Sequence, residues 1–200
     1  MSNKIKVLVS GGSGRFGKIL QEYGVKYNYI FPDKKKLNIL NEKSINKCLK
    51  KYKPKYFLHL AGLSRPMEIH SKDINKSISL NIIGTANVVK SCSPRNIKLI
   101  YFSTNYVYPG IKGDYKESDP ILPINKYAIS KFGGECAVQL YDNSLIFNAD
   151  SCAIASPRPF PNINKLFLFN KVNNKSILLL DISIVFLILI GLWLATGIYR

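Results

Sequence analysis

Short runs of apolar residues alternate with longer amphipathic stretches over the first three-quarters of the chain. The short runs are rich in β-branched and aromatic residues, which is typical of strands buried on both faces. The predicted strands are residues 4–10, 27–31, 56–60, 99–103 and 144–147. Apolar residues at helical spacing predict helices between them, at residues 18–23, 42–52, 74–91 and 126–140. Strands that alternate with helices predict an α/β fold with a doubly wound parallel sheet, because such crossovers are nearly always right-handed.

The pattern changes near residue 150, where prolines interrupt any regular periodicity and basic, Asn-rich sequence follows. We therefore expect one domain over residues 1–150 and a different unit over residues 151–200. The segment 176–199 is almost entirely apolar, with Asp181 as its only charged residue. Its length lies at the threshold for a helix that spans a membrane.

The net charge of +17 adds little to this picture, because the lysines are spread over the whole chain. No basic stripe with interleaved aromatic residues is present, so we expect no nucleic-acid partner. None of the four cysteines lies in a C-x-x-C pair or near a histidine at metal-ligand spacing. We expect no metal site, reduced thiols and a cytoplasmic location, since the N-terminus reads as a strand and not as a secretory signal.

A glycine-rich loop directly follows the first predicted strand. Residues 10–17 read S-G-G-S-G-R-F-G, which places Gly11, Gly14 and Gly17 at G-x-x-G-x-x-G spacing. Glycine lets the backbone approach a pyrophosphate closely, and the following helix offers free N–H groups and a positive dipole end. This position at the first strand–helix junction predicts a dinucleotide site, with Arg15 and Phe16 of the same loop also in contact with the cofactor.

The residues after the second predicted strand allow two interpretations of whether the dinucleotide carries a ribose 2′-phosphate. Arg15 and the lysines at residues 34–36 are suited to a ribose 2′-phosphate, whereas Asp33 is suited to a free 2′-hydroxyl. We favour NADP over NAD on this comparison.

A phenol and an ammonium group lie one helical turn apart in the sequence Tyr127-Ala-Ile-Ser-Lys131. A nearby Lys131 lowers the pKa of the phenol, which can then exchange a proton with a carbonyl or alcohol oxygen during hydride transfer. The fourth predicted strand ends at Ser103 and Thr104, where parallel sheets place their ligands. We expect the Thr104 hydroxyl to bind the same substrate oxygen as Tyr127.

Taken in order, these motifs resemble the extended short-chain dehydrogenase/reductases, and most closely the dTDP-4-dehydrorhamnose reductase family. The matching segments are VLVSGGSGRFG (7–17), LNIL (37–40), YKPKYFLHLAG (52–62), NIIGTANV (81–88), YFSTNYVY (101–108), GIKGDYKESDP (110–120) and YAISKFGGE (127–135). The resemblance covers residues 4–147. It implies a Rossmann fold and the reduction of a nucleotide-linked 4-keto-6-deoxy sugar by NADPH or NADH, in surface-polysaccharide biosynthesis.

The resemblance also implies roles for individual residues of this chain. The catalytic trio is Thr104, Tyr127 and Lys131, with Tyr127 the proton donor to the 4-keto oxygen. The residues expected at the cofactor are Gly11, Gly14, Arg15, Phe16, Gly17, Asn38, Ala61, Gly62, Ser103, Tyr127 and Lys131. The residues expected at the substrate are Thr104, Asn105 and Arg158. Asn38 stands where the family has an aspartate near the adenine, so that position keeps its hydrogen bonding but loses the charge.

Family members continue well beyond this length, so residues 151–200 read as the remnant of a substrate-binding lobe. On that interpretation the apolar segment 176–199 is a packed family helix, followed by the start of a strand at Thr196–Tyr199. The alternative is a membrane anchor with the enzyme domain on the cytoplasmic side, which we disfavour because of polar Ser183 and central Gly191. Subunits of this family often pair, so a second copy is an expected partner besides the nucleotide sugar.

Two other functions stay open at this point. One is an epimerase or dehydratase of the same superfamily, which often carries an acidic residue beside the threonine of the trio. Asn105 and Tyr106 occupy those positions here, which favours simple reduction. The other is a non-catalytic cofactor-binding or regulatory relative that keeps the Rossmann half alone.

Overall fold

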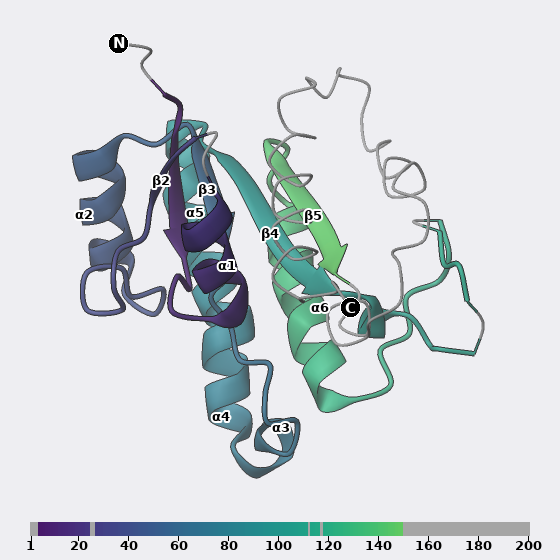
Figure 1. Ribbon diagram of the computed structural model, residues 1–200. Coiled ribbons are helices and arrows are strands. Elements are labelled where there is room, and N and C mark those ends of the chain that lie inside the picture. Colours follow the sequence, from purple (N-terminus) through teal and green to yellow (C-terminus); the bar gives the residue numbers. More distant parts are fainter. Residues whose placement is uncertain (1–3, 25–26, 112, 117, 150–200) are drawn as a thin grey trace, which may run out of the picture.

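The computed structural model describes residues 4–24, 27–111, 113–116 and 118–149. Its centre is a five-stranded sheet in which every pair of neighbouring strands is parallel, in the order β2-β1-β3-β4-β5 (Figure 1). The strands are β1 (Lys6–Ser10), β2 (Asn28–Ile30), β3 (Tyr56–His59), β4 (Lys98–Thr104) and β5 (Ser144–Ala149). The five predicted strands and the doubly wound α/β fold are therefore confirmed.

Helices connect the strands and cover the sheet. The helices are α1 (Arg15–Tyr23), α2 (Glu42–Tyr52), α3 (Ile69–Lys72), α4 (Ile74–Ser77), the π-helical turn η1 (Ile78–Ile83), α5 (Gly84–Cys92), the 3-10 turns η2 (Ser93–Arg95) and η3 (Asn105–Val107), and α6 (Lys126–Gln139). The helix predicted over residues 74–91 is thus one run interrupted by a π turn. The helix predicted to begin at residue 18 begins at Arg15, because the glycine loop leads straight into it.

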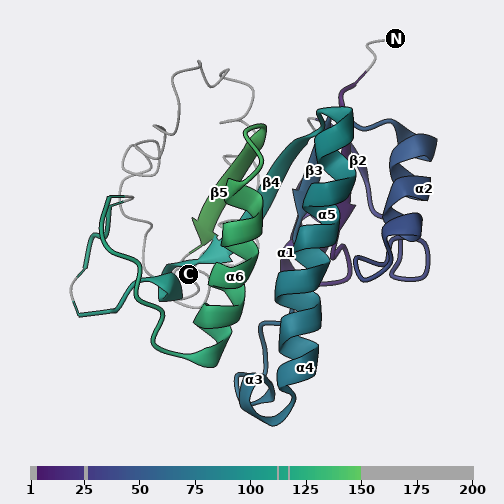
Figure 2. The same ribbon diagram turned by 180° about the vertical axis from the view of Figure 1, so that it is seen from behind.

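The two faces of the sheet form two separate cores, as the alternation of side chains along each strand requires. Leu8, Phe57 and Leu99 pack on the face that carries α2, α5 and α6. Val9, Leu58 and Ile100 point the other way and pack on the face of α1. Figure 2 shows α2, α5 and α6 together on one side of the sheet. Burial on both faces explains why the strands read as continuous apolar runs.

Side-chain caps explain where two of the site-bearing helices begin. The Asn125 side chain accepts a hydrogen bond from the Ala128 amide at 2.8 Å, so that Tyr127 lies in the first turn of α6. The Asp73 side chain accepts from the Lys76 amide at 2.9 Å at the start of α4. Caps of this kind satisfy amides that have no partner within the helix, and therefore define its first turn.

None of the helices within the described residues is long and apolar enough to cross a membrane. The apolar segment 176–199, Arg158 and the second unit expected over residues 151–200 lie outside the described residues.

Candidate active site

The glycine loop lies at the carboxyl end of β1, in the position predicted for a dinucleotide. Gly11 has φ of +77°, and a Cβ there would lie 2.6 Å from the Ala61 nitrogen. A Cβ on Gly17 would lie 2.5 Å from the Gly12 Cα atom. Both positions therefore require glycine, because any side chain would collide with backbone that cannot move freely.

The same loop leaves the first turn of α1 open to a ligand. Gly14 is the N-cap of α1 and provides no side chain to cap the first amides. A Cβ on Gly14 would meet only the Gly11 carbonyl oxygen, at 3.2 Å. Free N–H groups at a helix N-terminus, reached over bare backbone, are suited to a phosphate group. The residues present therefore fit the pyrophosphate of a dinucleotide.

The carboxyl end of β3 lies beside this loop. The Ala61 amide donates to the Ser10 hydroxyl at 3.4 Å, and the Leu60 amide donates to the Ser10 carbonyl at 3.2 Å. A Cβ on Gly62 would lie 3.0 Å from Asn81 Oδ1. The structure thus brings Ala61 and Gly62 to the glycine loop, which is where the sequence places the cofactor cleft.

Thr104 and Tyr127 meet at the carboxyl end of β4. Thr104 is buried at the last position of β4, and Tyr127 is half-buried in the first turn of α6. Burial raises the pKa of the Tyr127 phenol, whereas a hydrogen bond from Thr104 and the nearby Arg65 lower it. The phenol is consequently protonated at neutral pH and is held by a neighbour that can stabilise its anion.

Lys131 lies one turn after Tyr127 but directs its amine into the protein. Its Nζ atom donates to the Phe102 carbonyl at 2.6 Å and lies 4.0 Å from the centroid of the Tyr101 ring. Lys131 is 7% exposed, and burial lowers the pKa of its amine to about 7. The Lys131 amine therefore exchanges between its charged and neutral forms near neutral pH, and it contacts strand β4.

Aromatic rings hold Tyr127 from two sides. Its ring centroid lies 5.1 Å from that of His70 on α3 and 6.2 Å from that of Tyr106 in η3, the latter edge-on. His70 is 1% exposed, and its Nδ1 atom lies 2.8 Å from the Ser77 hydroxyl. Sequence analysis gave His70 and Arg65 no role, since neither belongs to a recognisable motif.

Asn81 is a further residue that sequence analysis did not assign. It lies in the π turn η1, and its Nδ2 group donates to the Leu63 carbonyl at 2.9 Å and to the Ser130 hydroxyl at 2.8 Å. Its Oδ1 atom accepts from the Leu63 amide at 2.7 Å. The Ser130 hydroxyl in turn donates to the Tyr127 carbonyl at 2.7 Å. Asn81 thus ties the loop after β3 to the first turns of α6, and π turns often occur at functional positions.

A buried hydrogen-bond chain links the glycine loop to Asn81 through His59. The Thr85 hydroxyl donates its single proton to the Asn81 carbonyl at 2.8 Å, so it can only accept from His59 Nε2 at 3.2 Å. His59 Nδ1 consequently carries a lone pair and accepts from the Ser10 hydroxyl at 2.8 Å. Burial and the charge of Lys131 lower the pKa of His59 to about 3. His59 is therefore the neutral, packed core residue that its place in an apolar strand indicates.

The structure also places four other predicted site residues. Phe16 packs edge-on against Phe102, with ring centroids 5.5 Å apart. Asn38 accepts from the Leu40 amide at 3.0 Å, in the turn that directly precedes α2. Arg15 is exposed at the start of α1, and Asn105 is half-buried at the start of η3. None of these contacts tests the roles that the sequence predicts.

Asp33, the residue suited to a free ribose hydroxyl, makes an ion pair with Lys36 at 3.2 Å and accepts from the Lys36 amide at 2.9 Å. These contacts lower the pKa of the Asp33 carboxyl. Lys34 and Lys35 are exposed beside it. The turn after β2 therefore presents cations around a carboxylate that is already engaged.

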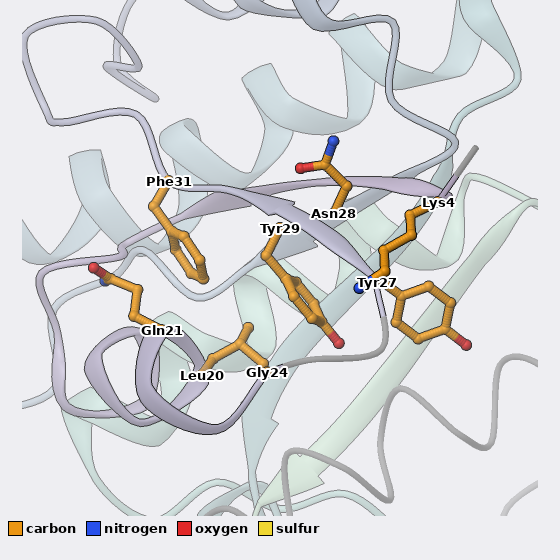
Figure 3. A pocket seen from close by; sticks show the side chains of 8 residues that line it. All are labelled: Lys4, Leu20, Gln21, Gly24, Tyr27, Asn28, Tyr29 and Phe31. Carbon is orange, nitrogen blue, oxygen red and sulfur yellow. The ribbon is translucent and has the colours of Figure 1, made fainter. Parts of the chain in front are cut away.

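An open hollow of about 530 Å³ lies between α1 and the edge strand β2. Figure 3 shows its lining, with the Tyr29 and Phe31 rings directed toward Leu20 and Gln21 of α1. It contains none of the predicted site residues. Within the described residues no group of His, Cys, Asp and Glu side chains could hold a metal ion.

Comparisons with known proteins find similarity to dTDP-4-dehydrorhamnose reductases and to methionine adenosyltransferase 2 subunit beta. The chain is 28% identical over 188 residues to methionine adenosyltransferase 2 subunit beta of Xenopus laevis, which covers 86% of this chain and 54% of that protein. It is 27% identical over 134 residues to dTDP-4-dehydrorhamnose reductase of Aggregatibacter actinomycetemcomitans, covering 65% of this chain and 45% of that protein. The chain spans about half the length of the curated relatives it matches.

A solved structure with the same fold is that of dTDP-4-dehydrorhamnose reductase from Bacillus anthracis in complex with NADP. The TM-score is 0.68 at 30% identity, over 74% of this chain and 53% of that one. The model of the RmlD substrate binding domain family matches residues 5–148, which include β1 to β4, all but the last residue of β5, the glycine loop, Thr104 and Tyr127. The chain therefore belongs to the RmlD substrate binding domain family.

Proposed function

We propose that this protein is an NAD(P)H-dependent reductase of a nucleotide-linked 4-keto-6-deoxy sugar, similar to dTDP-4-dehydrorhamnose reductase. The observation that carries the proposal is the meeting of Thr104 and Tyr127 at the carboxyl end of β4, on the sheet edge where the glycine loop also lies. A proton donor beside a dinucleotide loop is the arrangement that carbonyl reduction requires. Relatives named as reductases of this kind support the choice of substrate.

The dinucleotide, when bound on Gly11, Gly14 and Gly17, supplies the hydride. The chain's own residues supply the proton and stabilise the group that gives it up. Tyr127 is protonated at neutral pH because burial raises the pKa of its phenol, so it can donate to the carbonyl oxygen of the sugar. Thr104 stabilises the phenolate left behind, and the nearby Arg65 charge favours it too, while Lys131 lies one turn further along the same helix.

NADPH is the cofactor that the turn after β2 favours. Asp33 is engaged with Lys36, and Lys34 and Lys35 are exposed beside it, so cations outnumber the carboxylate in this turn. Arg15 is a further exposed cation, at the start of α1. NADH remains the alternative cofactor. Asn105 and Arg158 are the residues we assign to the nucleotide-sugar substrate, and a second copy of the chain is the partner expected from the family.

The setting we propose is surface-polysaccharide biosynthesis in the cytoplasm. This rests on the family resemblance and on the substrates named for its relatives.

A non-catalytic, cofactor-binding subunit is the second candidate function. It is favoured by the similarity to methionine adenosyltransferase 2 subunit beta, which extends over 86% of this chain. Retention of Thr104, Tyr127 and Lys131 favours the reductase instead, because cofactor binding alone does not require a proton donor at the end of β4.

Titration of the purified chain with NADPH and NADH, followed by nucleotide fluorescence, tests the cofactor site. We expect micromolar binding that Gly14→Asp abolishes, because an added carboxylate would repel the pyrophosphate. Gly14 is exposed and a Cβ there meets only one carbonyl oxygen at 3.2 Å, so the variant should fold. Gly113→Asp is the matched control, because a Cβ at Gly113 meets nothing within 4 Å. Absence of binding in folded wild-type protein would overturn both candidate functions.

Oxidation of NADPH in the presence of dTDP-4-keto-6-deoxy sugars separates the two candidates. The reductase reading predicts turnover that falls at least about 100-fold in Tyr127→Phe, the usual contribution of a positioned general acid. Cofactor binding should survive in that variant, because the phenol oxygen is not part of the glycine loop. Tight cofactor binding without turnover of any such sugar would contradict the reductase and favour the subunit.

A further inference from the structure

Helix α6 carries a second buried ionisable group one turn beyond Lys131. Glu135 is 2% exposed and Lys131 is 7% exposed, although carboxylates and amines are seldom buried to this extent. The i and i+4 positions of a helix lie on one face, so both side chains leave α6 in the same direction. The proposed reaction uses Lys131 and gives Glu135 no role.

Tight packing closes this part of the protein to water. A Cβ on Gly134, between the two residues, would lie 2.6 Å from the Tyr101 hydroxyl and 2.6 Å from the Asn81 carbonyl oxygen. The Tyr101 hydroxyl donates to the Lys131 carbonyl at 3.4 Å, which brings β4 against α6. Figure 1 shows α6 lying along β4 at this position. Neither charge can therefore be hydrated as it would be on the surface.

The carboxyl of Glu135 is incompletely bonded in this setting. Its Oε1 atom has no hydrogen-bond partner among the described residues. The Lys131 amine donates to the Phe102 carbonyl, which carries only a partial charge. A buried charge without an opposite charge is strongly unfavourable, and Glu135 and Lys131 each lie within the electrostatic influence of the other.

We propose that Glu135 is the buried counter-ion of Lys131 and a positioning residue of the site, which keeps the Lys131 amine charged. The proposal deepens the proposed reductase function and rests on it for its catalytic meaning. The interaction itself is a property of the folded chain, with or without a cofactor.

The pKa values of Lys131 and Glu135 are each shifted in opposite directions by burial and by neighbouring groups. Burial lowers the pKa of Lys131, and Glu135 raises it. Burial raises the pKa of Glu135, whereas Ser103 and Lys131 lower it. His59 and the Tyr101 and Tyr127 phenols, which also lie near the pair, are neutral at neutral pH. Glu135 is consequently the only anionic side chain that we assign to the amine.

The alternative role for Glu135 is that of a space-filling polar residue. An uncharged amide of the same shape would fill that role equally well, so Glu135→Gln separates the two. Glu135→Asp keeps the charge on a shorter side chain. Cys136→Ser, at the adjacent exposed position, is a control for changes that do not reach the pair.

The test is an NMR titration of the full chain labelled with ¹³C at the lysine ε carbon, with Lys131→Met used to assign the Lys131 signal. We expect Lys131 to titrate near neutral pH in wild type and in Cys136→Ser, and at least one pH unit lower in Glu135→Gln. Glu135→Asp should lie between the two. An unchanged Lys131 titration in folded Glu135→Gln would overturn the proposal.

A reciprocal measurement covers the case in which Glu135→Gln does not fold. Coupling between two sites is mutual, so Lys131→Met must raise the pKa of Glu135 by as much as Glu135 raises that of Lys131. The carboxyl carbon of Glu135, labelled with ¹³C, reports this directly. A Glu135 titration that is the same in wild type and in Lys131→Met would contradict the proposal. Neither measurement needs a substrate, so a chain that shows the coupling but reduces no sugar would refute the proposed function alone.

Discussion

His59 illustrates how buried hydrogen bonds decide the chemistry of a single residue. Its Nε2 must donate to the Thr85 hydroxyl, because that hydroxyl donates its only proton to the Asn81 carbonyl. Its Nδ1 must therefore accept from Ser10, which fixes the tautomer of the neutral ring. This arrangement agrees with a pKa lowered to about 3 by burial and by Lys131.

The shifted pKa of His59 predicts how stability depends on pH. Between about pH 6.5 and pH 3 the unfolded chain carries a proton on this residue and the folded chain does not. Unfolding then takes up a proton, so the free energy of unfolding should fall as pH falls, by up to about 1.4 kcal/mol per pH unit.

Urea unfolding at pH 7.0, 6.0 and 5.0 measures this dependence. His59→Gln removes the titrating group while keeping a side-chain N–H, and should show a shallower decrease than wild type. His70 contributes in the same direction in both proteins, because burial also lowers its pKa. Equal slopes for wild type and His59→Gln would show that His59 is protonated in the folded state.

At the scale of elements, the π turn η1 determines how the loop after β3 meets helix α6. It carries Asn81, whose amide makes three hydrogen bonds, to both backbone groups of Leu63 and to Ser130. The Ser130 hydroxyl in turn donates a hydrogen bond to the Tyr127 carbonyl. The position of α6, which carries Tyr127, thus depends on a side chain from a different element.

Asn81→Ala should loosen that connection and lower both stability and the proposed activity. We expect a loss of about 1–3 kcal/mol in the free energy of unfolding, because the variant leaves buried polar groups of Leu63 and Ser130 without their partner. The loss in turnover should exceed what the lower folded fraction explains, because Tyr127 is displaced. Urea unfolding and NADPH oxidation measure the two effects.

Asn87→Ala is the matched control for this prediction. Asn87 lies on α5 in the same helical run, and its Nδ2 group donates to the Ile39 carbonyl at 3.0 Å, away from Tyr127. It should cost about 1 kcal/mol in stability and leave turnover per folded molecule unchanged. If both variants reduced turnover equally, Asn81 would have no particular role at the site.

At the scale of the whole molecule, the sheet brings separate strand ends to one edge. The glycine loop after β1, the Ala61–Gly62 segment after β3 and Thr104 at the end of β4 all lie there, on the lower edge of the sheet in Figure 1. A ligand that contacts two of these segments at once would be bound only by the folded chain.

NADPH should therefore raise the thermal stability of the chain. A ligand that binds only the folded state raises the free energy of unfolding by about 2.7 kcal/mol when its free concentration is 100 times the Kd. Differential scanning calorimetry with increasing NADPH should show a rising Tm in wild type and in Gly113→Asp. A constant Tm is expected in Gly14→Asp, and a constant Tm in wild type would contradict a built cofactor site.

Much of this protein follows from local features of its sequence. The order of the strands and helices, the parallel sheet, the glycine loop and the Tyr127–Lys131 spacing all depend on periodicity or on residues a few positions apart. The position of Thr104 at a strand end is of the same kind. These features need no knowledge of which distant residues meet.

Tertiary structure alone decided what those residues contact. The Asn81 hydrogen bonds, the proton position on His59 and the direction of the Lys131 amine toward Phe102 each join residues that are 18 to 49 positions apart. The burial of Glu135 likewise depends on β4 packing against α6. Burial and long-range hydrogen bonds set pKa values and side-chain directions, and no local pattern in the chain encodes them.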